Sequence, residues 1–314
     1  YCQTDPLNGT DIPSDFDGDG NCDYTDNDDD NDGTLDSQDD FPFDGSADTD
    51  TDGDGMPDSM SVPDATDIPT QGLIGHWAFD ESSGDPADSS GLGHTSTANG
   101  DPSYGEDGHA DSAIHFDGDG DYVEVDASDD FNVTNITISL WVKLGYVFNS
   151  TSDPMYAAGL VCRGDGLEEV WCIDLIVDND GTGNMILSYR FWHRHSSQNW
   201  NYTAIRTTST LDLEWAHVTA TYDGTTSKIY LNGQLEGWVN TSYGALSGSS
   251  ESVFVATRQN AQAGGAPVNE VNATIDEVRI YDRALSDAEV SILYQVSYTL
   301  IEDLDDDNDG WSDE

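Results

Sequence analysis

One spacing of acidic residues recurs four times along the chain. Counted from its first Asp, the pattern places carboxylates at positions 1, 3, 5, 9 and 12 and glycine at position 6. Ca²⁺ takes roughly six to eight hard oxygen ligands, and alternate carboxylates on a tight loop supply them, together with a backbone carbonyl from position 7. The glycine permits the sharp turn. The spacing therefore predicts calcium loops, and we call each copy of the pattern a ladder.

The ladder positions identify the residues predicted to bind Ca²⁺. The predicted ligands, with the carbonyl donors at position 7 included, are Asp15, Asp17, Asp19, Asn21, Asp23, Asp26, Asp28, Asp30, Asp32, Thr34, Asp36, Asp39, Asp50, Asp52, Asp54, Met56, Asp58, Asp305, Asp307, Asp309, Trp311 and Asp313. The third ladder departs from the pattern because Ser61 stands at position 12, and the fourth is present only through position 10. Carboxylates about 4–5 Å apart repel each other by about 1 kcal/mol in water and by more in a drier site. Several Ca²⁺ ions are therefore predicted to hold the ladders together.

Two other interpretations of the ladders are weaker. A solvated acidic linker or a salt-adapted surface uses Glu freely and needs no register, whereas Asp outnumbers Glu 50 to 13 here. True EF-hands or dockerin modules need a helix beside each loop, and ladders that begin at Asp15 and Asp28 leave no room for one.

The net charge limits the partners. The chain has 314 residues, 63 of them acidic and 9 basic, so its formal net charge is −54, and no basic residue precedes Lys143. Such a polyanion is repelled by phosphate backbones and anionic lipid heads, so nucleic acid and membrane surfaces are poor partners. No stretch approaches the roughly 20 apolar residues of a membrane span. The chain has no initiator Met and no signal-like run, which we interpret as a processed mature chain or an excised piece.

Cysteines and glycosylation sequons favour the cell exterior. The four cysteines, which include no metal-type CxxC pair, are Cys2, Cys22, Cys162 and Cys172. Such an even count suits disulfides in an oxidising compartment. The seven Asn-x-Ser/Thr sequons begin at Asn8, Asn132, Asn135, Asn149, Asn201, Asn240 and Asn272. Together these features predict a secreted or surface-exposed, N-glycosylated protein.

The composition separates three segments. Residues 1–67 contain 22 Asp and no hydrophobic period, so they cannot form a core and are either disordered or organised by something bound to them. Residues 71–298 alternate in hydrophobicity, and the expected strands are 136–142, 173–177, 185–191, 202–207, 217–222, 228–231, 252–256 and 275–281. A capping box of Ser286 and Glu289 predicts one short helix near residues 286–294. Acidic sequence returns in residues 302–314, which begin a further ladder.

The ladders resemble thrombospondin type-3 repeats. They begin at residues 15, 28 and 50, so the spacings are similar to that family's short and long units. The resemblance implies a calcium-wrapped segment without a hydrophobic core, in which a bridge between Cys2 and Cys22 would be suitable.

The middle of the chain, about residues 71–297, resembles laminin-G-like members of the concanavalin A-like lectin/glucanase superfamily. The segments that carry the resemblance are Gly75–Glu81, His115–Gly118, Asp121–Val123, Thr137–Lys143, Trp215–Val218, Tyr222–Gly224, Ile229–Gly233, Ile275–Tyr281 and Leu285–Glu289. The resemblance implies a mainly β fold, a two-sheet antiparallel jelly-roll sandwich.

The resemblance does not imply that this chain is an enzyme. Glucanases of the superfamily carry two Glu flanking an Asp on one strand, as the paired carboxylates that glycoside cleavage needs. The nearest segment here, Trp171–Ile176, contains Asp174 and no Glu. No grouping of Ser, His and Asp or of Cys and His is evident, so we expect no enzyme.

Several other signals have plain structural interpretations. Asp117–Asp121 mimics a ladder but is expected to be a turn, and His193 and His195 are expected to be surface side chains. The adhesion tripeptide Arg163-Gly164-Asp165 is explained by a hairpin that a Cys162–Cys172 disulfide closes.

Two further groups of side chains are candidate ligand-binding sites. Core or strand-pair packing is preferred to a sugar platform for Trp192 and Trp200. By the same superfamily resemblance, Asp80, Asp88 and Asp276 are candidates for a calcium site at the rim of the sandwich.

The sequence thus predicts a non-catalytic, extracellular, calcium-binding structural or adhesive protein. Ladders on both sides of the sandwich suggest that copies associate end to end in a filament or surface array. The rival prediction is a carbohydrate-binding accessory module of a larger secreted enzyme. A hydrolase is the third and weakest, because no strand with paired carboxylates is found.

Overall fold

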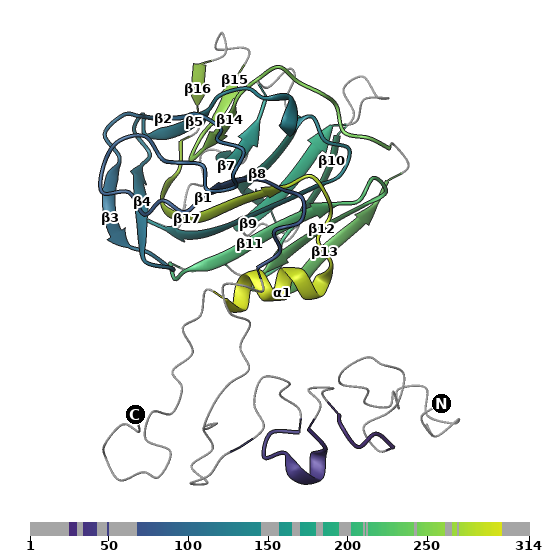
Figure 1. Ribbon diagram of the computed structural model, residues 1–314. Helices are drawn as coiled ribbons and strands as arrows, with labels where there is room; N and C mark the ends of the chain where they lie inside the picture. The colour runs from purple at the N-terminus through teal and green to yellow at the C-terminus, as the bar shows by residue number, and fades with distance from the viewer. Residues whose placement is uncertain are drawn as a thin grey trace, which may run out of the picture. The chain divides into compact units, whose positions relative to one another are not determined.

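The computed structural model describes residues 25–29, 34–42, 49, 68–145, 157–164, 170–179, 185–194, 202–209, 211, 213–241, 244–260, 266–268 and 270–296. The chain divides into two units, Tyr1–Thr66 with Thr299–Glu314, and Asp67–Tyr298. Figure 1 shows the elements of both. In the described part of the first unit the regular element is a 3-10 helix, η1 (Asp36–Gln38).

The second unit is a sandwich of two antiparallel sheets, which confirms the predicted fold class. The first sheet has the order β13-β12-β11-β6-β17-β4-β3, with β1 also paired to β17. Its strands are β1 (Leu73–Trp77), β3 (Ser103–Asp107), β4 (Ser112–Asp117), β6 (Ile136–Leu144), β11 (Ala216–Tyr222), β12 (Thr226–Leu231), β13 (Gln234–Asn240) and β17 (Asn272–Tyr281).

The second sheet has the order β10-β9-β8-β7-β14-β5-β2. Its strands are β2 (Ser96–Asn99), β5 (Tyr122–Val125), β7 (Ala157–Arg163), β8 (Trp171–Asn179), β9 (Met185–Arg194), β10 (Tyr202–Arg206) and β14 (Val253–Val255). A separate hairpin pairs β15 (Arg258–Asn260) with β16 (Ala266–Val268), and a 3-10 turn, η2 (Asp129–Phe131), precedes β6.

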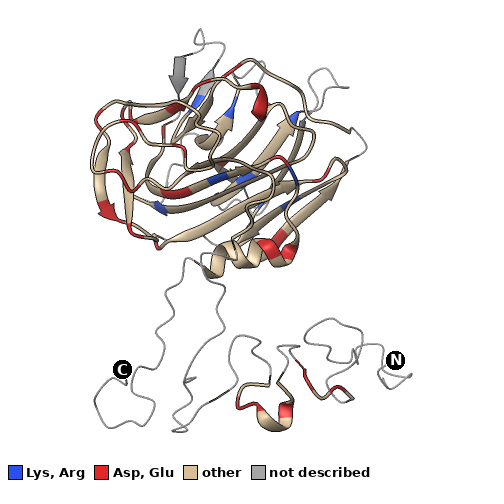
Figure 2. Cartoon of the chain, viewed as in Figure 1, with Lys and Arg blue, Asp and Glu red and all other residues tan. Residues whose placement is uncertain are grey.

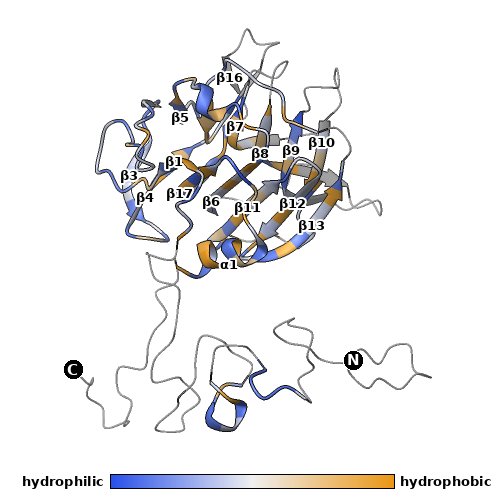
Figure 3. Ribbon diagram, turned by 45° about the vertical axis from the view of Figure 1, so that its right-hand side comes forward, coloured by the Kyte–Doolittle hydropathy of each residue, from blue (hydrophilic) through white to orange (hydrophobic). Residues whose placement is uncertain are grey.

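Alternating side chains build the core between the sheets. On β8, Trp171, Ile173 and Leu175 point into the core, so Cys172 and Asp174 point to the opposite face of the second sheet. Figure 3 shows the hydrophobic colour gathered on the strands of the sandwich. Each of the eight strands expected from hydrophobic alternation is present, with shifts of a few residues at the ends.

The helix α1 (Asp287–Gln295) covers the outer face of the first sheet. Ser286 accepts the backbone N–H of Glu289, whose side chain returns to the N-cap, which confirms the predicted capping box. The helix buries Val290 and Leu293 against Tyr230 and Tyr281 of the sheet. Because α1 lies there, β6 is buried on both faces, as its nearly unbroken burial shows.

The backbone is left-handed at a hairpin turn and at a strand bulge. Asn232 and Gly233 have φ angles of 50° and 74° and join β12 to β13, as their sequence predicts for a hairpin turn. Glu277 has a φ of 53° at a bulge in β17, where the pairing with β6 shifts register between Asp276 and Arg279. None of the described helices is long and apolar enough to cross a membrane.

Candidate functional site

The structure describes part of the second ladder and the last ligand position of the first. Asp28, Thr34, Asp36 and Asp39 of the second ladder's predicted ligands are described, and so is Asp26 of the first ladder. The Asp36 carboxylate accepts the backbone N–H of Asp29 at 2.9 Å, which closes the loop on itself. The other predicted ladder ligands lie outside the described residues.

Two carboxylates of this ladder fit a cation. Asp28 and Asp39 stand at positions 1 and 12, and Asp39 is 8% exposed. Asp28 Oδ1 and Asp39 Oδ2 are buried without a hydrogen-bond partner among the described residues. A buried carboxylate oxygen without a donor is costly unless a cation is near. The described residues alone contain no group of three His, Cys, Asp or Glu placed to hold a metal ion, and positions 3 and 5 of this ladder are not among them.

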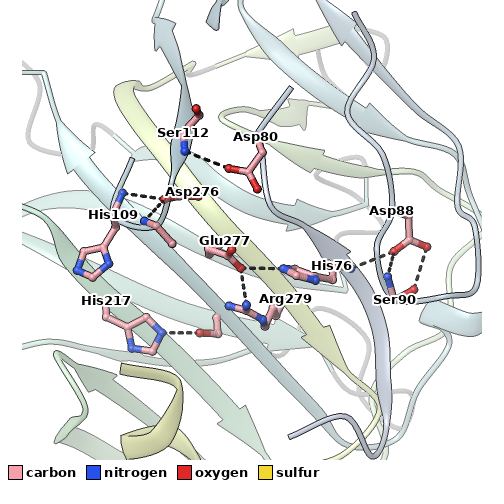
Figure 4. Close-up of polar contacts among 12 residues, drawn as sticks. His76, Asp80, Asp88, Ser90, His109, Ser112, His217, Asp276, Glu277 and Arg279 are labelled. Carbon is pink, nitrogen blue, oxygen red and sulfur yellow. Dashed lines mark hydrogen bonds and ion pairs between the residues drawn. The ribbon is translucent and has the colours of Figure 1, made fainter. Parts of the chain in front are cut away.

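A polar network surrounds the bulge of β17 (Figure 4). Glu277 lies 2.7 Å from His76 Nε2 and also pairs with Arg279. Burial by itself raises the pKa of the Glu277 carboxyl, but these contacts outweigh it and lower the pKa. The bulge thus turns Glu277 toward His76 and Arg279, and these contacts favour its ionised form.

Asp276 is the buried carboxyl of this network. It is fully buried, and its Oδ2 accepts the backbone N–H groups of His109 and Ala110 at 2.8 and 2.9 Å. Its Oδ1 has no hydrogen-bond partner among the described residues. Burial, together with the charges of Glu277 and Asp80, raises the pKa of Asp276 to about 7, although those two hydrogen bonds oppose the rise.

The predicted rim calcium site is only partly assembled. Burial raises the pKa of Asp80, whose charge is felt at Asp276. Asp88, however, accepts hydrogen bonds from the backbone of His76, Ser90 and His94, so it organises its own loop. The three carboxylates are not gathered into a metal-binding group in the described part of the chain. We assign this network to holding the bulge and the neighbouring loop in place.

Two histidines next to this network, the buried His217 and the half-buried His109, are neutral at ordinary pH. His217 Nε2 lies 2.8 Å from Ser139 Oγ, and burial lowers its pKa to about 3. His109 stacks on Trp141 with ring centroids 3.3 Å apart, and burial lowers its pKa to about 4. Both imidazoles thus pack against side chains of β6.

A second polar cluster lies on the outer face of the second sheet. Asp174 on β8 is fully buried, and Arg190 on β9 donates to both of its oxygens, at 2.9 and 2.5 Å. Trp192 Nε1 donates to Asp174 Oδ2 at 3.2 Å, and Arg258 Nη1 lies 3.6 Å from the same oxygen. Burial raises the pKa of Asp174, and the contacts with the two arginines oppose that rise.

The sheet register places this cluster. Asp174 is the direct cross-strand partner of Arg190, and Arg190 is the partner of Arg206 on β10. The disulfide between Cys162 and Cys172 lies beside it on the same face, since these cysteines are partners on β7 and β8. Sequence analysis missed this cluster, because the pairing of β8 with β9 and the tertiary placement of the β15 hairpin bring Asp174, Arg190 and Arg258 together.

The structure confirms some of the minor sequence predictions and contradicts one of them. The Cys162–Cys172 disulfide is present, Asp117–Asp121 is a turn with Asp121 buried, and Trp192 is 6% exposed and packs on the disulfide, all as expected. The expectation that His193 lies on the surface is wrong, because it is buried 2.6 Å from Ser227 Oγ.

The arginine of the Arg-Gly-Asp tripeptide, Arg163, is not accessible to a ligand. Arg163 is fully buried, and its guanidinium donates to the backbone carbonyls of Phe131, Ser128 and Ser249. An adhesion ligand therefore cannot reach this guanidinium without unfolding the region.

The remaining predictions concern residues that the structure covers unevenly. Among the predicted sequons, Asn132 and Asn240 are exposed and Asn135 and Asn272 are half-buried. The Asn132 amide donates to Asp129, and the Asn272 amide donates to Asp117. The predicted residues outside the described part of the chain are Cys2, Cys22, Asn8, Asn149, Asn201, Asp165, His195 and Trp200.

The family comparison matches residues 117–291 to the model described as the concanavalin A-like lectin/glucanases superfamily (Laminin_G_3). No curated protein matches the chain.

Solved structures share the fold at low identity. They include the binding domain of Paraclostridial Mosquitocidal Protein 1, at 18% identity and a TM-score of 0.57, covering 71% of this chain and 52% of that chain. The binding domain of botulinum neurotoxin DC in complex with SialylT is 16% identical, with a TM-score of 0.56 and coverages of 73% and 52%. The binding domain of botulinum neurotoxin serotype G is 18% identical, with a TM-score of 0.54, and the match covers 71% of this chain and 50% of that chain. The chain therefore spans about half the length of these structures.

Proposed function

The chain belongs to the concanavalin A-like lectin/glucanases superfamily, and from that premise we propose that it is a non-catalytic carbohydrate-binding protein of the cell exterior. The fold alone does not choose between binding and hydrolysis, because function depends on the site. The proposal therefore depends on what the outer face of the second sheet offers.

The observation that carries the proposal is the buried carboxylate of Asp174. It fixes the guanidinium of Arg190 through two hydrogen bonds at the surface of the sheet. A donor held by a buried partner loses little conformational entropy when a sugar hydroxyl or carboxylate binds it. This is the preorganisation that a binding face requires.

The same carboxylate argues against hydrolysis. Glycoside cleavage needs two carboxyl groups that flank the scissile bond, one as acid and one as base or nucleophile. Asp174 is fully buried and bonded to Arg190 and Trp192, so it cannot transfer a proton to a substrate. The network around Asp276 is likewise occupied by structural contacts.

The ladders complete the proposal as calcium-stabilised segments that precede and follow the binding domain in the sequence. The spacing of their carboxylates and the two buried oxygens at Asp28 and Asp39 support this role. The disulfide between Cys162 and Cys172 and the exposed sequon at Asn240 support a secreted, glycosylated protein. Ladders at both ends would also let copies join end to end as an adhesive filament or array.

Binding of oligosaccharides by the full chain in calcium tests the proposal. We expect saturable binding on a glycan array and in titration calorimetry, with every bound oligosaccharide recovered intact by mass spectrometry. Ala204 is exposed on β10, directly opposite Trp192, so Ala204→Tyr should obstruct the face and weaken binding by roughly tenfold.

The matched control is Ala87→Tyr, which adds the same ring at an exposed position in the loop after β1 and should leave binding unchanged. Cleavage of any bound oligosaccharide, or equal losses in the two variants, would contradict the proposal.

A further inference from the structure

Trp238 is the most exposed large hydrophobic residue in the described part of the chain, at 62%. It lies on β13, the edge strand of the first sheet, where Leu235 is also exposed. Figure 2 shows few charged residues along the strands of this sheet and acidic ones on α1. A large exposed apolar side chain on an edge strand favours association with other chains unless something covers it.

The residue opposite Trp238 on the neighbouring strand does not cover the indole. Lys228 of β12 is its direct cross-strand partner. The Lys228 ammonium instead lies 2.5 Å from the carboxylate of Asp287 at the start of α1 and 5.9 Å from the centroid of the Tyr230 ring. The lysine side chain is therefore directed toward the helix, which leaves the indole open to solvent.

A glycosylation sequon begins next to this indole. Asn240 follows Trp238 by two residues on β13, so their side chains share one face of the sheet, with Cα atoms about 7 Å apart. Both residues are exposed, whereas Val239 between them packs against the core. Among the seven sequons of the chain, that at Asn240 alone has an aromatic residue two positions before the Asn. A sugar on Asn240 would therefore stand beside the indole.

The side-chain amide of Asn240 is oriented for such an attachment. Thr226, the directly opposite residue of β12, donates its hydroxyl to Asn240 Oδ1 at 2.9 Å. Asn240 Nδ2 has no hydrogen-bond partner among the described residues. In contrast, Nδ2 of Asn132 and Nδ2 of Asn272 each already donate a hydrogen bond within the fold. The Asn240 amide is thus held by its oxygen, and its nitrogen is accessible.

We infer that Asn240 carries an N-linked glycan whose first sugar ring packs on the indole of Trp238. In the attachment, Nδ2 loses one proton and bonds to C1 of a sugar carried on a lipid phosphate. The bond between C1 and the phosphate oxygen breaks, and the lipid phosphate leaves with the electron pair. The C–H face of the sugar then meets the electron-rich face of the indole. The inference rests on the proposed secreted, glycosylated protein and adds the modified residue and the surface that the glycan covers.

Mass spectrometry of glycopeptides tests the attachment. The sample is the full chain, secreted in calcium by a host that glycosylates Asn-x-Ser/Thr sequons. We expect the peptide that contains Asn240 to carry a glycan in most molecules. Ser242→Ala removes the sequon but retains Asn240 and its bond with Thr226, so it supplies the chain without this glycan. An unmodified Asn240 in the parent chain would overturn the inference.

A double-mutant cycle tests the packing on the indole. In the parent chain, Ser242→Ala should lower the folding equilibrium constant of the sandwich roughly fivefold, because Trp238 loses its cover. In the Trp238→Ala background the same change should have little effect. Leu235→Ala is the matched control, because it removes another exposed apolar side chain of β13 and should retain the fivefold effect. Urea denaturation in calcium, followed by the fluorescence of the buried tryptophans, measures all of these variants.

The outcomes separate this inference from the proposed function, which the glycan array tests independently. If the glycan on Asn240 has the same effect with and without Trp238, the packing is wrong although carbohydrate binding stands. If Trp238→Ala weakens oligosaccharide binding by the chain that lacks the glycan, the indole belongs to the ligand site, which also overturns the inference. If Asn240 is glycosylated and coupled to Trp238 but the array shows no binding, the inference stands and the proposed carbohydrate binding falls.

Discussion

Asp276 shows how a single buried carboxyl couples the bulge of β17 to pH. Its carboxylate receives two backbone N–H groups on one oxygen and has no hydrogen-bond partner among the described residues on the other. Burial raises its pKa to about 7, so the folded chain binds a proton that the unfolded chain releases near pH 4. Stability from this group is therefore full at low pH and is lost as the pH rises through 7.

Asp276→Asn should remove this dependence. Between pH 5 and pH 8 the parent sandwich should lose roughly 2 kcal/mol of unfolding free energy that the variant does not lose. Urea denaturation followed by tryptophan fluorescence at both pH values measures the difference. Asp101→Asn, at an exposed position, is the control and should keep the parent slope. Parallel pH profiles for the parent and Asp276→Asn would show that the carboxyl is ionised throughout.

At the scale of elements, the cap of α1 fixes how the helix covers the first sheet. The Ser286 hydroxyl accepts the N–H of Glu289 at 3.2 Å, while Arg283 holds the Glu289 carboxylate from the other side. Hydrogen bonds from Arg283 lower the pKa of Glu289 to about 2, with burial opposing them. The cap therefore keeps its charge at any ordinary pH.

Ser286→Ala should destabilise the sandwich by about 1 kcal/mol, because the N–H of Glu289 loses its acceptor. Ser286→Thr retains the hydroxyl and should cost much less. Urea denaturation in calcium measures both variants. Equal losses for Ala and Thr would mean that the hydroxyl is not the stabilising group.

The disulfide between β7 and β8 is the second element-scale device. Cys162 and Cys172 are 10 residues apart, and closing a loop of that length stabilises the folded state by about 3 kcal/mol in the chain-entropy account. The double variant Cys162→Ala with Cys172→Ala should lose about 2–3 kcal/mol of sandwich stability. Reductant should destabilise the parent sandwich similarly and leave the double variant unaffected. A reductant effect of equal size in both would place the stabilising bridge elsewhere.

At the scale of the whole molecule, the two units depend on different forces. The sandwich buries a large apolar core, whereas the ladders consist mainly of acidic and small polar residues. Without a cation, the converging carboxylates of a ladder repel one another. We therefore expect chelation to affect the two units unequally.

Calorimetry with and without chelator should separate two transitions. Each saturated calcium site adds about 3 kcal/mol at a free calcium concentration a hundredfold above its Kd. The ladder transition should disappear on chelation, while the sandwich transition remains. A thermogram that does not change with chelator would contradict the proposal that calcium stabilises the ladders.

A pair of neighbouring residues sharpens this test. Asp39→Asn should reduce the number of bound calcium ions by one, because a buried oxygen of Asp39 lacks a donor. Asp40→Asn is the control, since Asp40 is exposed and lies outside the ladder positions. Metal analysis of the dialysed chain counts the ions.

Local patterns were sufficient for much of this protein. Hydrophobic alternation predicted the main strands, Ser286 and Glu289 predicted the start of α1, and the spacing of Asp and Gly predicted the calcium ladders, which stay a prediction. Each of these three patterns involves residues within about a dozen positions of one another, so it can be recognised in the sequence without knowledge of the fold. The sandwich itself was inferred from resemblance and confirmed by the structure.

The tertiary structure alone decided the sites. Asp174 meets Arg190 because β8 and β9 pair in that register, and it meets Arg258 because the separate hairpin of β15 lies next to it. Burial of Asp276 and of His193 likewise depends on what other strands place over them, and the surface assignment of His193 failed for that reason. A side chain's pKa and partners are set by groups distant in sequence, and no local pattern specifies which of them will arrive.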